Sequence, residues 1–122
     1  MTDFTAVAAT YLETWNETDE TRRLELIEQH WATDARYVDP MASVEGRAAI
    51  SELVGAVQAQ FPGFVFSIDR PADGHGSQLR FGWGLGEPGK EPVAFGFDVA
   101  VLDDAGRIAE VRGFLEQVPS GT

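Results

Sequence analysis

The sequence contains no cysteine and only two histidines, His30 and His75. The lack of cysteine excludes disulfide bonds, thiolate catalysis and cysteine-based zinc sites. With so few histidines we expect no histidine-based metal site, and we expect no cofactor. No apolar run approaches the roughly 20 residues that cross a bilayer, and the first residues lack the basic and apolar segments of a signal peptide. We therefore expect a soluble, cytoplasmic protein.

Positive charge is also scarce, because 9 Lys and Arg stand against 20 Asp and Glu, which gives a net charge of −11. Nucleic acids and anionic membranes bind basic surfaces, so neither is expected as a partner. The 122 residues are enough for one hydrophobic core. No repeat, linker or change of composition indicates a second domain, so we expect a single domain over residues 1–122.

The first half of the chain has the period of helices. Apolar residues recur every three or four positions over residues 4–15, and Asp3 can serve as the N-cap. A second helix is expected over residues 20–31. A third should begin near residue 47 and end at Phe61-Pro62-Gly63, which is a strong stop signal.

Between the second and third helices lies a short predicted strand, Tyr37-Val38, that ends on an aspartate. Because Pro40 restricts the residue before it to extended geometry, Asp39 should close this strand before a tight turn. A carboxylate at the rim of an apolar region is a candidate base. The alternative interpretation is a turn-forming aspartate that only accepts hydrogen bonds from nearby backbone groups.

In the second half of the chain the period changes to two. The alternation predicts strands over residues 64–69, 79–86, 92–102 and 107–118, with a turn-rich connection at residues 71–76. Helices come first and strands last. This order indicates an α+β fold in which the helices pack on one face of a curved sheet.

The two faces of the long strands differ in side-chain size. On strand 92–102, one face carries valine and phenylalanine, and the other carries Ala94, Gly96 and Asp98. Strand 79–86 repeats this contrast, and we expect the small residues of both strands to share a face. That face would leave a cavity for Asp98, while the large residues would pack on a second subunit. Alternatively, the small face is exposed to solvent and Asp98 is a surface residue.

Four segments, in this order along the chain, resemble the nuclear transport factor 2-like superfamily, in its SnoaL-like and ketosteroid-isomerase-like branch. They are residues 11–16 (YLETWN), 31–40 (WATDARYVDP), 46–50 (GRAAI) and 98–108 (DVAVLDDAGRI). The resemblance implies a single SnoaL-like, cystatin-like α+β domain. In this fold a strongly bent antiparallel sheet wraps three N-terminal helices around a central pocket. It also implies a homodimer formed through the outer face of the sheet.

The resemblance to ketosteroid isomerase extends to the residues of its chemistry. It implies that Asp39, in the Asp-Pro step, removes a proton alpha to a carbonyl group. It also implies that Tyr11 and a neutral Asp98 donate hydrogen bonds to the enolate oxygen. The residues expected to line the pocket around these three are Trp15, Trp31, Val54, Arg80, Ala94, Gly96, Val111 and Leu115.

The chain departs from the isomerase at the tyrosines that support the oxyanion tyrosine, because the matching positions here are Trp31 and Val54. Arg80 could also pair with Asp98, which would keep Asp98 ionised and remove its donor role. The first hypothesis is a cofactor-independent enzyme, isomerase-like or polyketide-cyclase-like, that transfers a proton on a small apolar carbonyl compound. The alternative is a non-catalytic small-molecule-binding or dimerisation module of the same fold.

Overall fold

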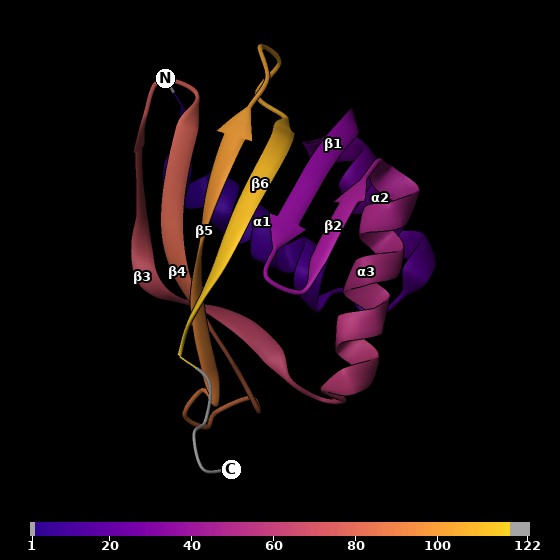
Figure 1. Cartoon of the computed structure of the whole chain (residues 1–122), viewed down its shortest axis with the longest axis vertical. Helices are drawn as coiled ribbons and strands as arrows, with labels where there is room; N and C mark the ends of the chain where they lie inside the picture. Colours follow the sequence, from indigo (N-terminus) through magenta and orange to yellow (C-terminus); the bar gives the residue numbers. More distant parts are fainter. Residues whose placement is uncertain (1, 118–122) are drawn as a thin grey trace.

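The computed structural model describes residues 2–117, in which three helices lie against a six-stranded sheet (Figure 1). The helices are α1 (Phe4–Asn16), α2 (Glu20–His30) and α3 (Arg47–Gln60), close to the predicted bounds. The side chains of Asp3 and Asp19 cap α1 and α2 by accepting hydrogen bonds from backbone N–H groups of the first turn. No helix in this part of the chain is long and apolar enough to cross a membrane.

The strands form one strongly curved, open sheet in the order β2-β1-β6-β5-β4-β3. Neighbouring strands are antiparallel except β1 and β6, which are parallel. The α+β prediction is confirmed. The expected antiparallel sheet differs only in this one parallel pair. The strands are β1 (Trp31–Asp39), β2 (Ala42–Glu45), β3 (Val65–His75), β4 (Gln78–Gly86), β5 (Ala94–Leu102) and β6 (Ile108–Gln117).

Two strand predictions were too short, and one strand was missed. β1 begins at Trp31 rather than Tyr37, and residues 42–45 return beside it as β2 instead of forming only a turn. β3 continues through Pro71 to His75. It is an edge strand, and its register with β4 shifts between Arg70 and Asp73. Proline has no backbone N–H to donate, and this is tolerated at such an irregular edge position. The end of the last predicted strand, from residue 118, lies outside the described residues.

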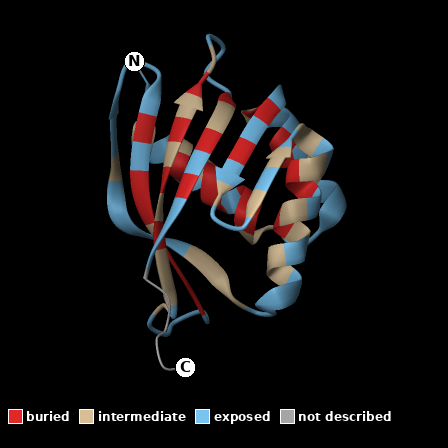
Figure 2. Ribbon diagram, in the orientation of Figure 1, coloured by how far each residue is buried: buried red, intermediate tan, exposed pale blue. Residues whose placement is uncertain are grey.

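The inner face of the sheet and the helices enclose a hydrophobic core, seen in Figure 2 as red bands that alternate with exposed positions along the strands. Fully buried side chains come from each layer: Trp31 and Val111 from the sheet, Ile27 from α2, and Ile50 and Val54 from α3. Burying each such side chain contributes about 1.5–3 kcal/mol. These contacts hold the helices on the sheet and fix the walls of the cavity beside them.

The expectation that the small residues of β4 and β5 share a face is wrong. The register pairs Phe81 with Asp98 and Trp83 with Gly96, and directly paired residues of antiparallel strands lie on the same face. The large residues of β4 therefore stand beside the small residues of β5 on the inner face. Gly82 lies on the outer face, where a Cβ atom would meet the side chain of Arg70.

Candidate functional site

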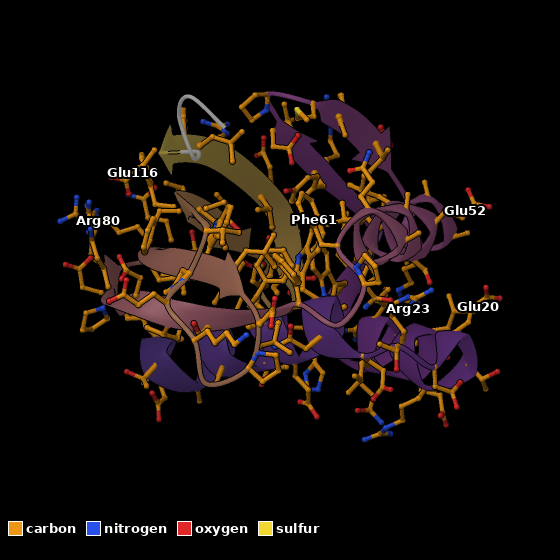
Figure 3. The ribbon with its side chains drawn as sticks, turned by 90° about the horizontal axis from the view of Figure 1, so that it is seen from below. Glu20, Arg23, Glu52, Phe61, Arg80 and Glu116 are labelled. Atoms are coloured by element: carbon orange, nitrogen blue, oxygen red, sulfur yellow. The ribbon has the colours of Figure 1, made fainter. Side chains whose placement is uncertain are left out.

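A cavity of about 430 Å³ opens between α1, α3 and the inner face of the sheet. Figure 3 looks towards the open end of the sheet, with Phe61, one of the lining residues, near the centre of the view. Most of the wall is apolar, and its members include Leu12, Leu53, Val57, Phe66 and Leu85. Apart from Gln60 and the indole groups of Trp15 and Trp83, the polar side chains that line it are Tyr11, Tyr37, Asp39 and Asp98.

Asp39 closes β1 and is held by three hydrogen bonds. Its Oδ1 atom accepts from the backbone N–H groups of Met41 and Ala42, both at 2.8 Å. Its Oδ2 atom accepts from the hydroxyl group of Tyr37 at 2.7 Å. Asp39 is thus a turn-forming aspartate that also lines the cavity.

Asp98 lies deeper, with 3 % of its surface exposed. Its Oδ2 atom accepts from the hydroxyl group of Tyr11 at 2.7 Å, and its Oδ1 atom accepts from Nε1 of Trp83 at 3.2 Å. Burial is the main cause that raises the pKa of Asp98 from 3.8 to about 6, and the charge of Asp39 adds to it. The hydrogen bonds from Tyr11 and Trp83 act in the opposite direction, because they favour the ionised form.

Both tyrosines of the cavity remain protonated at neutral pH. Burial raises the pKa of Tyr11 well above its usual range, and the negative charge of Asp98 raises it further. Burial also raises the pKa of Tyr37, with further contributions from Asp98 and Asp39. Each tyrosine therefore offers a hydroxyl donor to the carboxylate beside it.

The side chains of Asp39 and Asp98 both approach a glycine of the strand between them. Gly113 pairs with Asp98 across β5 and β6, and it follows the residue that pairs with Val38 of β1. A Cβ atom at Gly113 would stand 2.9 Å from Asp98 Oδ1 and 3.2 Å from Asp39 Cβ. A larger residue at this position would therefore force the two acidic side chains apart.

Comparison with known proteins shows which family the chain belongs to. The family model of the SnoaL-like domain matches residues 8–111. The chain belongs to the SnoaL-like family. This family lies within the nuclear transport factor 2-like superfamily, as the sequence predicted. No curated protein matches the chain significantly.

Several solved structures resemble this SnoaL-like protein. A candidate isomerase of the SnoaL-like family from Agrobacterium tumefaciens is 44% identical, with a TM-score of 0.91 over 96% of this chain and all of that one (100%). A candidate ketosteroid isomerase from Kribbella flavida is 20% identical, with a TM-score of 0.70 over 98% of this chain and 82% of that one. A candidate polyketide cyclase from Sinorhizobium meliloti is 19% identical, with a TM-score of 0.67 over 88% of this chain and 93% of that one. The latter two establish the shared fold.

The cavity of this SnoaL-like protein contains six of the residues expected there. Tyr11, Asp39 and Asp98 line it, and so do the residues Trp15, Ala94 and Leu115. Trp31, Val54 and Val111 instead lie in the core with no exposed surface. Trp31 supports the site from behind, because its ring stacks on Tyr11 with 5.6 Å between the ring centroids.

Two expected lining residues lie elsewhere for reasons of register. The ring of Trp83 lies directly over Gly96 and covers it. Arg80 pairs with Val99 on the outer face and forms an exposed ion pair with Asp73 at 3.0 Å. Figure 3 shows Arg80 at the far edge of the sheet, away from Phe61. The anticipated pairing of Arg80 with Asp98 is therefore not formed.

Two residues of the site were missed by the sequence analysis. Tyr37 stands two positions before Asp39, so strand alternation places both side chains on one face, and this signal was present in the sequence. Gly113 interrupts the strand pattern between Val111 and Leu115, which typically marks a close approach of neighbouring groups. Only the pairing of β6 between β1 and β5 reveals which groups approach there.

Proposed function

We propose that this protein is a cofactor-independent enzyme that transfers a proton on a small apolar carbonyl compound. The observation that carries the proposal is the position of the two Tyr–Asp pairs in an otherwise mostly apolar cavity. Such an arrangement places a carboxylate base and hydrogen-bond donors beside one bound molecule. The names of the similar proteins from Agrobacterium tumefaciens and Sinorhizobium meliloti, a candidate isomerase and a candidate polyketide cyclase, point to the same kind of chemistry.

In the proposed reaction Asp39 is the base. The C–H bond alpha to the carbonyl group breaks, its proton moves to Asp39, and the electron pair of the bond forms an enolate. Tyr11 and the protonated form of Asp98 donate hydrogen bonds to the enolate oxygen, where the negative charge develops. Return of the proton to the same or another carbon completes the cycle and restores the carboxylate.

The charge of the cavity favours a neutral substrate. No lysine, arginine or histidine is among its lining residues in the described part of the chain. A carboxylate or phosphate group of a ligand would therefore meet two acidic side chains without a cation to balance it. We expect a neutral ketone or ester whose apolar body lies against α1 and α3.

The test uses proton exchange, which can be measured before any product is identified. Neutral carbonyl compounds that raise the thermal unfolding temperature are incubated with the protein in D₂O, and deuterium at the alpha carbon is measured by mass spectrometry. We expect exchange with the wild type and a loss of at least about 100-fold in Asp39→Asn, the size typical of general-base catalysis. Asp73→Asn, which removes an exposed carboxylate, is the matched control. Wild-type exchange that survives in Asp39→Asn would refute the assignment of the base.

A second candidate function is non-catalytic binding in the same cavity. It is favoured by one observation: both oxygens of Asp98 already accept hydrogen bonds, from Tyr11 and Trp83, and Asp39 accepts three. Polar groups that satisfy one another suit a pocket that holds a ligand without reacting. Compounds that stabilise the protein but exchange no deuterium would favour this function.

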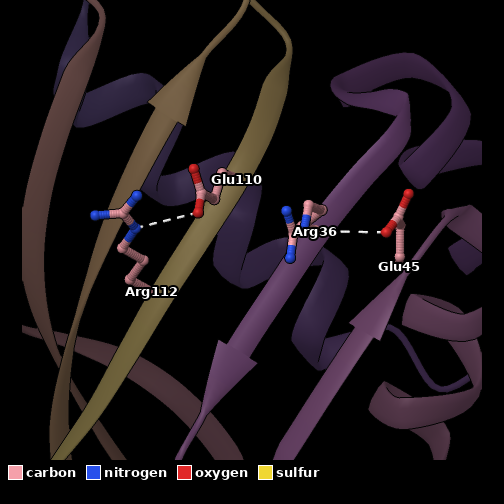
Figure 4. A network of polar contacts seen from close by, with 4 residues as sticks. All are labelled: Arg36, Glu45, Glu110 and Arg112. Atoms are coloured by element: carbon pink, nitrogen blue, oxygen red, sulfur yellow. Dashed lines mark hydrogen bonds and ion pairs between the residues drawn. The ribbon is translucent and has the colours of Figure 1, made fainter.

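We also propose that the partner at the outer face of the sheet is a second copy of this chain. This face carries stacked Phe97 and Phe114, with ring centroids 4.8 Å apart, and Phe114 is 47% exposed. Figure 4 shows two ion pairs. Arg36 on β1 pairs with Glu45 on β2, and Arg112 pairs with Glu110 on the same strand, β6. An apolar centre beside charges of both signs can be complementary to itself, as a two-fold dimer interface requires.

A further inference from the structure

Four of the aromatic side chains that line the cavity form a continuous row of ring contacts. In order, this aromatic row consists of Tyr37 on β1, Trp15 on α1, Phe66 on β3 and Trp83 on β4. The centroids of successive rings are 5.5, 5.5 and 5.3 Å apart, and their planes are tilted by 49°, 66° and 78°. Successive rings therefore face different directions instead of stacking in parallel. The proposed proton transfer gives this row no part in the chemistry.

A carboxylate lies at each end of the aromatic row. Tyr37 donates to Oδ2 of Asp39 at 2.7 Å, and Nε1 of Trp83 donates to Oδ1 of Asp98 at 3.2 Å. Asp39 is partly exposed. Each carboxylate oxygen has two acceptor positions, so Oδ2 of Asp39 can accept one further hydrogen bond from a ligand in the cavity.

No positive charge within the cavity balances these carboxylates. In the part of the chain that the structure describes, its titratable lining residues are Tyr11 on α1, Tyr37 and Asp39 on β1, and Asp98 on β5. The lining residues from α3, β2, β3, β4 and β6 are not titratable. Figure 3 shows Arg80 and Arg23 on opposite sides of Phe61, each well away from this lining residue. The same charge that disfavours an anionic ligand therefore favours a cationic one.

We propose that the cavity also binds an apolar amine in its ammonium form, which donates to Asp39 and lies against the aromatic row. The faces of aromatic rings attract cations, most strongly where both partners are removed from water. Asp98 is already removed from water in the free protein, so binding adds mainly the cost of dehydrating the ammonium group. A cavity of about 430 Å³ has the size of a small-molecule site and leaves room for an apolar body beside the amine.

This second ligand class lies beyond the proposed function and does not depend on it. The proposed carbonyl substrate requires the protonated form of Asp98, whereas an ammonium ion is attracted to the ionised form. Burial raises the pKa of Asp98 to about 6, so this group loses its proton at pH values where an alkylamine keeps its own. A bound cation favours the ionised carboxylate. The affinity for the amine should therefore rise with pH through this range, while the affinity for a neutral compound should not.

The test compares two compounds of nearly the same shape, phenethylamine and phenethyl alcohol, by isothermal titration calorimetry with the wild-type protein. At pH 8 we expect the amine to bind at least about tenfold more tightly, the size of a desolvated contact between a cation and an aromatic ring. We also expect this preference to decrease as the pH is lowered to 5. Binding is measured without turnover, so its outcome is distinct from that of the deuterium exchange. Equal affinities at pH 8, no binding of the amine, or a preference that does not change with pH would each overturn the proposal.

Variants assign the preference to the residues. Asp39→Asn should bring the affinity for the amine close to that for the alcohol, and Asp98→Asn should remove the pH dependence. Phe66→Leu keeps an apolar side chain in the wall but removes a ring of the aromatic row, so it should reduce the preference for the amine. Asp73→Asn, which removes an exposed carboxylate, is the matched control and should bind both compounds as the wild type does. A preference that persists in full in Asp39→Asn would overturn the proposed contact.

Discussion

Replacement of Asp98 by asparagine should change how the stability of the protein depends on pH. In the folded state the pKa of Asp98 is raised from 3.8 to about 6, chiefly by burial. The folded protein therefore binds more protons at this site than the unfolded chain between these two values. The resulting stabilisation is fully present below pH 3.8 and is lost as the pH rises through about 6.

The size of the effect follows from the pKa values. One pKa unit corresponds to about 1.4 kcal/mol, so the shift of Asp98 represents roughly 3 kcal/mol in total, of which roughly 2–3 kcal/mol falls between pH 4 and pH 7. Asparagine has nearly the same shape and no charge to lose. It will disturb one of the hydrogen bonds from Tyr11 and Trp83, but this cost does not depend on pH.

The measurement is urea unfolding of the wild type and Asp98→Asn at several pH values from 4 to 7, at one low protein concentration. The quantity of interest is the difference between their free energies of unfolding, because the other acidic residues titrate in both proteins. We expect the free energy of unfolding of Asp98→Asn to increase relative to that of the wild type by roughly 2–3 kcal/mol as the pH rises from 4 to 7. Asp73→Asn serves as an exposed control. A difference that stays constant over this range would show that Asp98 is not desolvated, and the reasoning would fail.

Two further predictions concern the helices and the outer face. Arg23 is 4% exposed and donates to Ser51 Oγ and Gln58 Oε1, so Arg23→Met should cost about 1–3 kcal/mol for each acceptor left unsatisfied. Urea unfolding measures this loss, and an unchanged stability would contradict it. If the outer face binds a second copy, Phe114→Asp should convert the dimer to a monomer in sedimentation velocity, whereas Met41→Asp, at an exposed position on the cavity wall, should remain dimeric. A wild type that sediments as a monomer would refute the dimer.

Most of the fold could be predicted because its local signals agree with one another. The apolar spacing of α1 and α3 matches the faces that they bury, and the Phe61-Pro62-Gly63 stop follows the last helical residue. Strand lengths were harder, since the second half of β3 is largely exposed and lacks a clean alternation of apolar and polar residues, and β2, although it alternates, is only four residues long. Their pairing partners stabilise them, and a partner distant in sequence leaves no local trace.

Site residues could be predicted where their neighbours in the sequence determine their position in the structure. Asp39 precedes a proline and Asp98 stands among small residues, so both could be assigned to the cavity from the sequence. Arg80 and Gly96 could not, because their environment depends on the register between β4 and β5. A shift of that register by one residue would exchange the faces, and the alternation within each strand does not determine the register.

The hydrogen bonds of Asp39 limit how it could act as a base. A carboxylate offers about four acceptor positions, two on each oxygen. The N–H groups of Met41 and Ala42 occupy both positions on Oδ1, and Tyr37 occupies one on Oδ2. A single position on Oδ2 therefore remains to receive a proton from a substrate. The turn that fixes Asp39 thus also selects the atom that reacts, and this is the same atom that Tyr37 contacts.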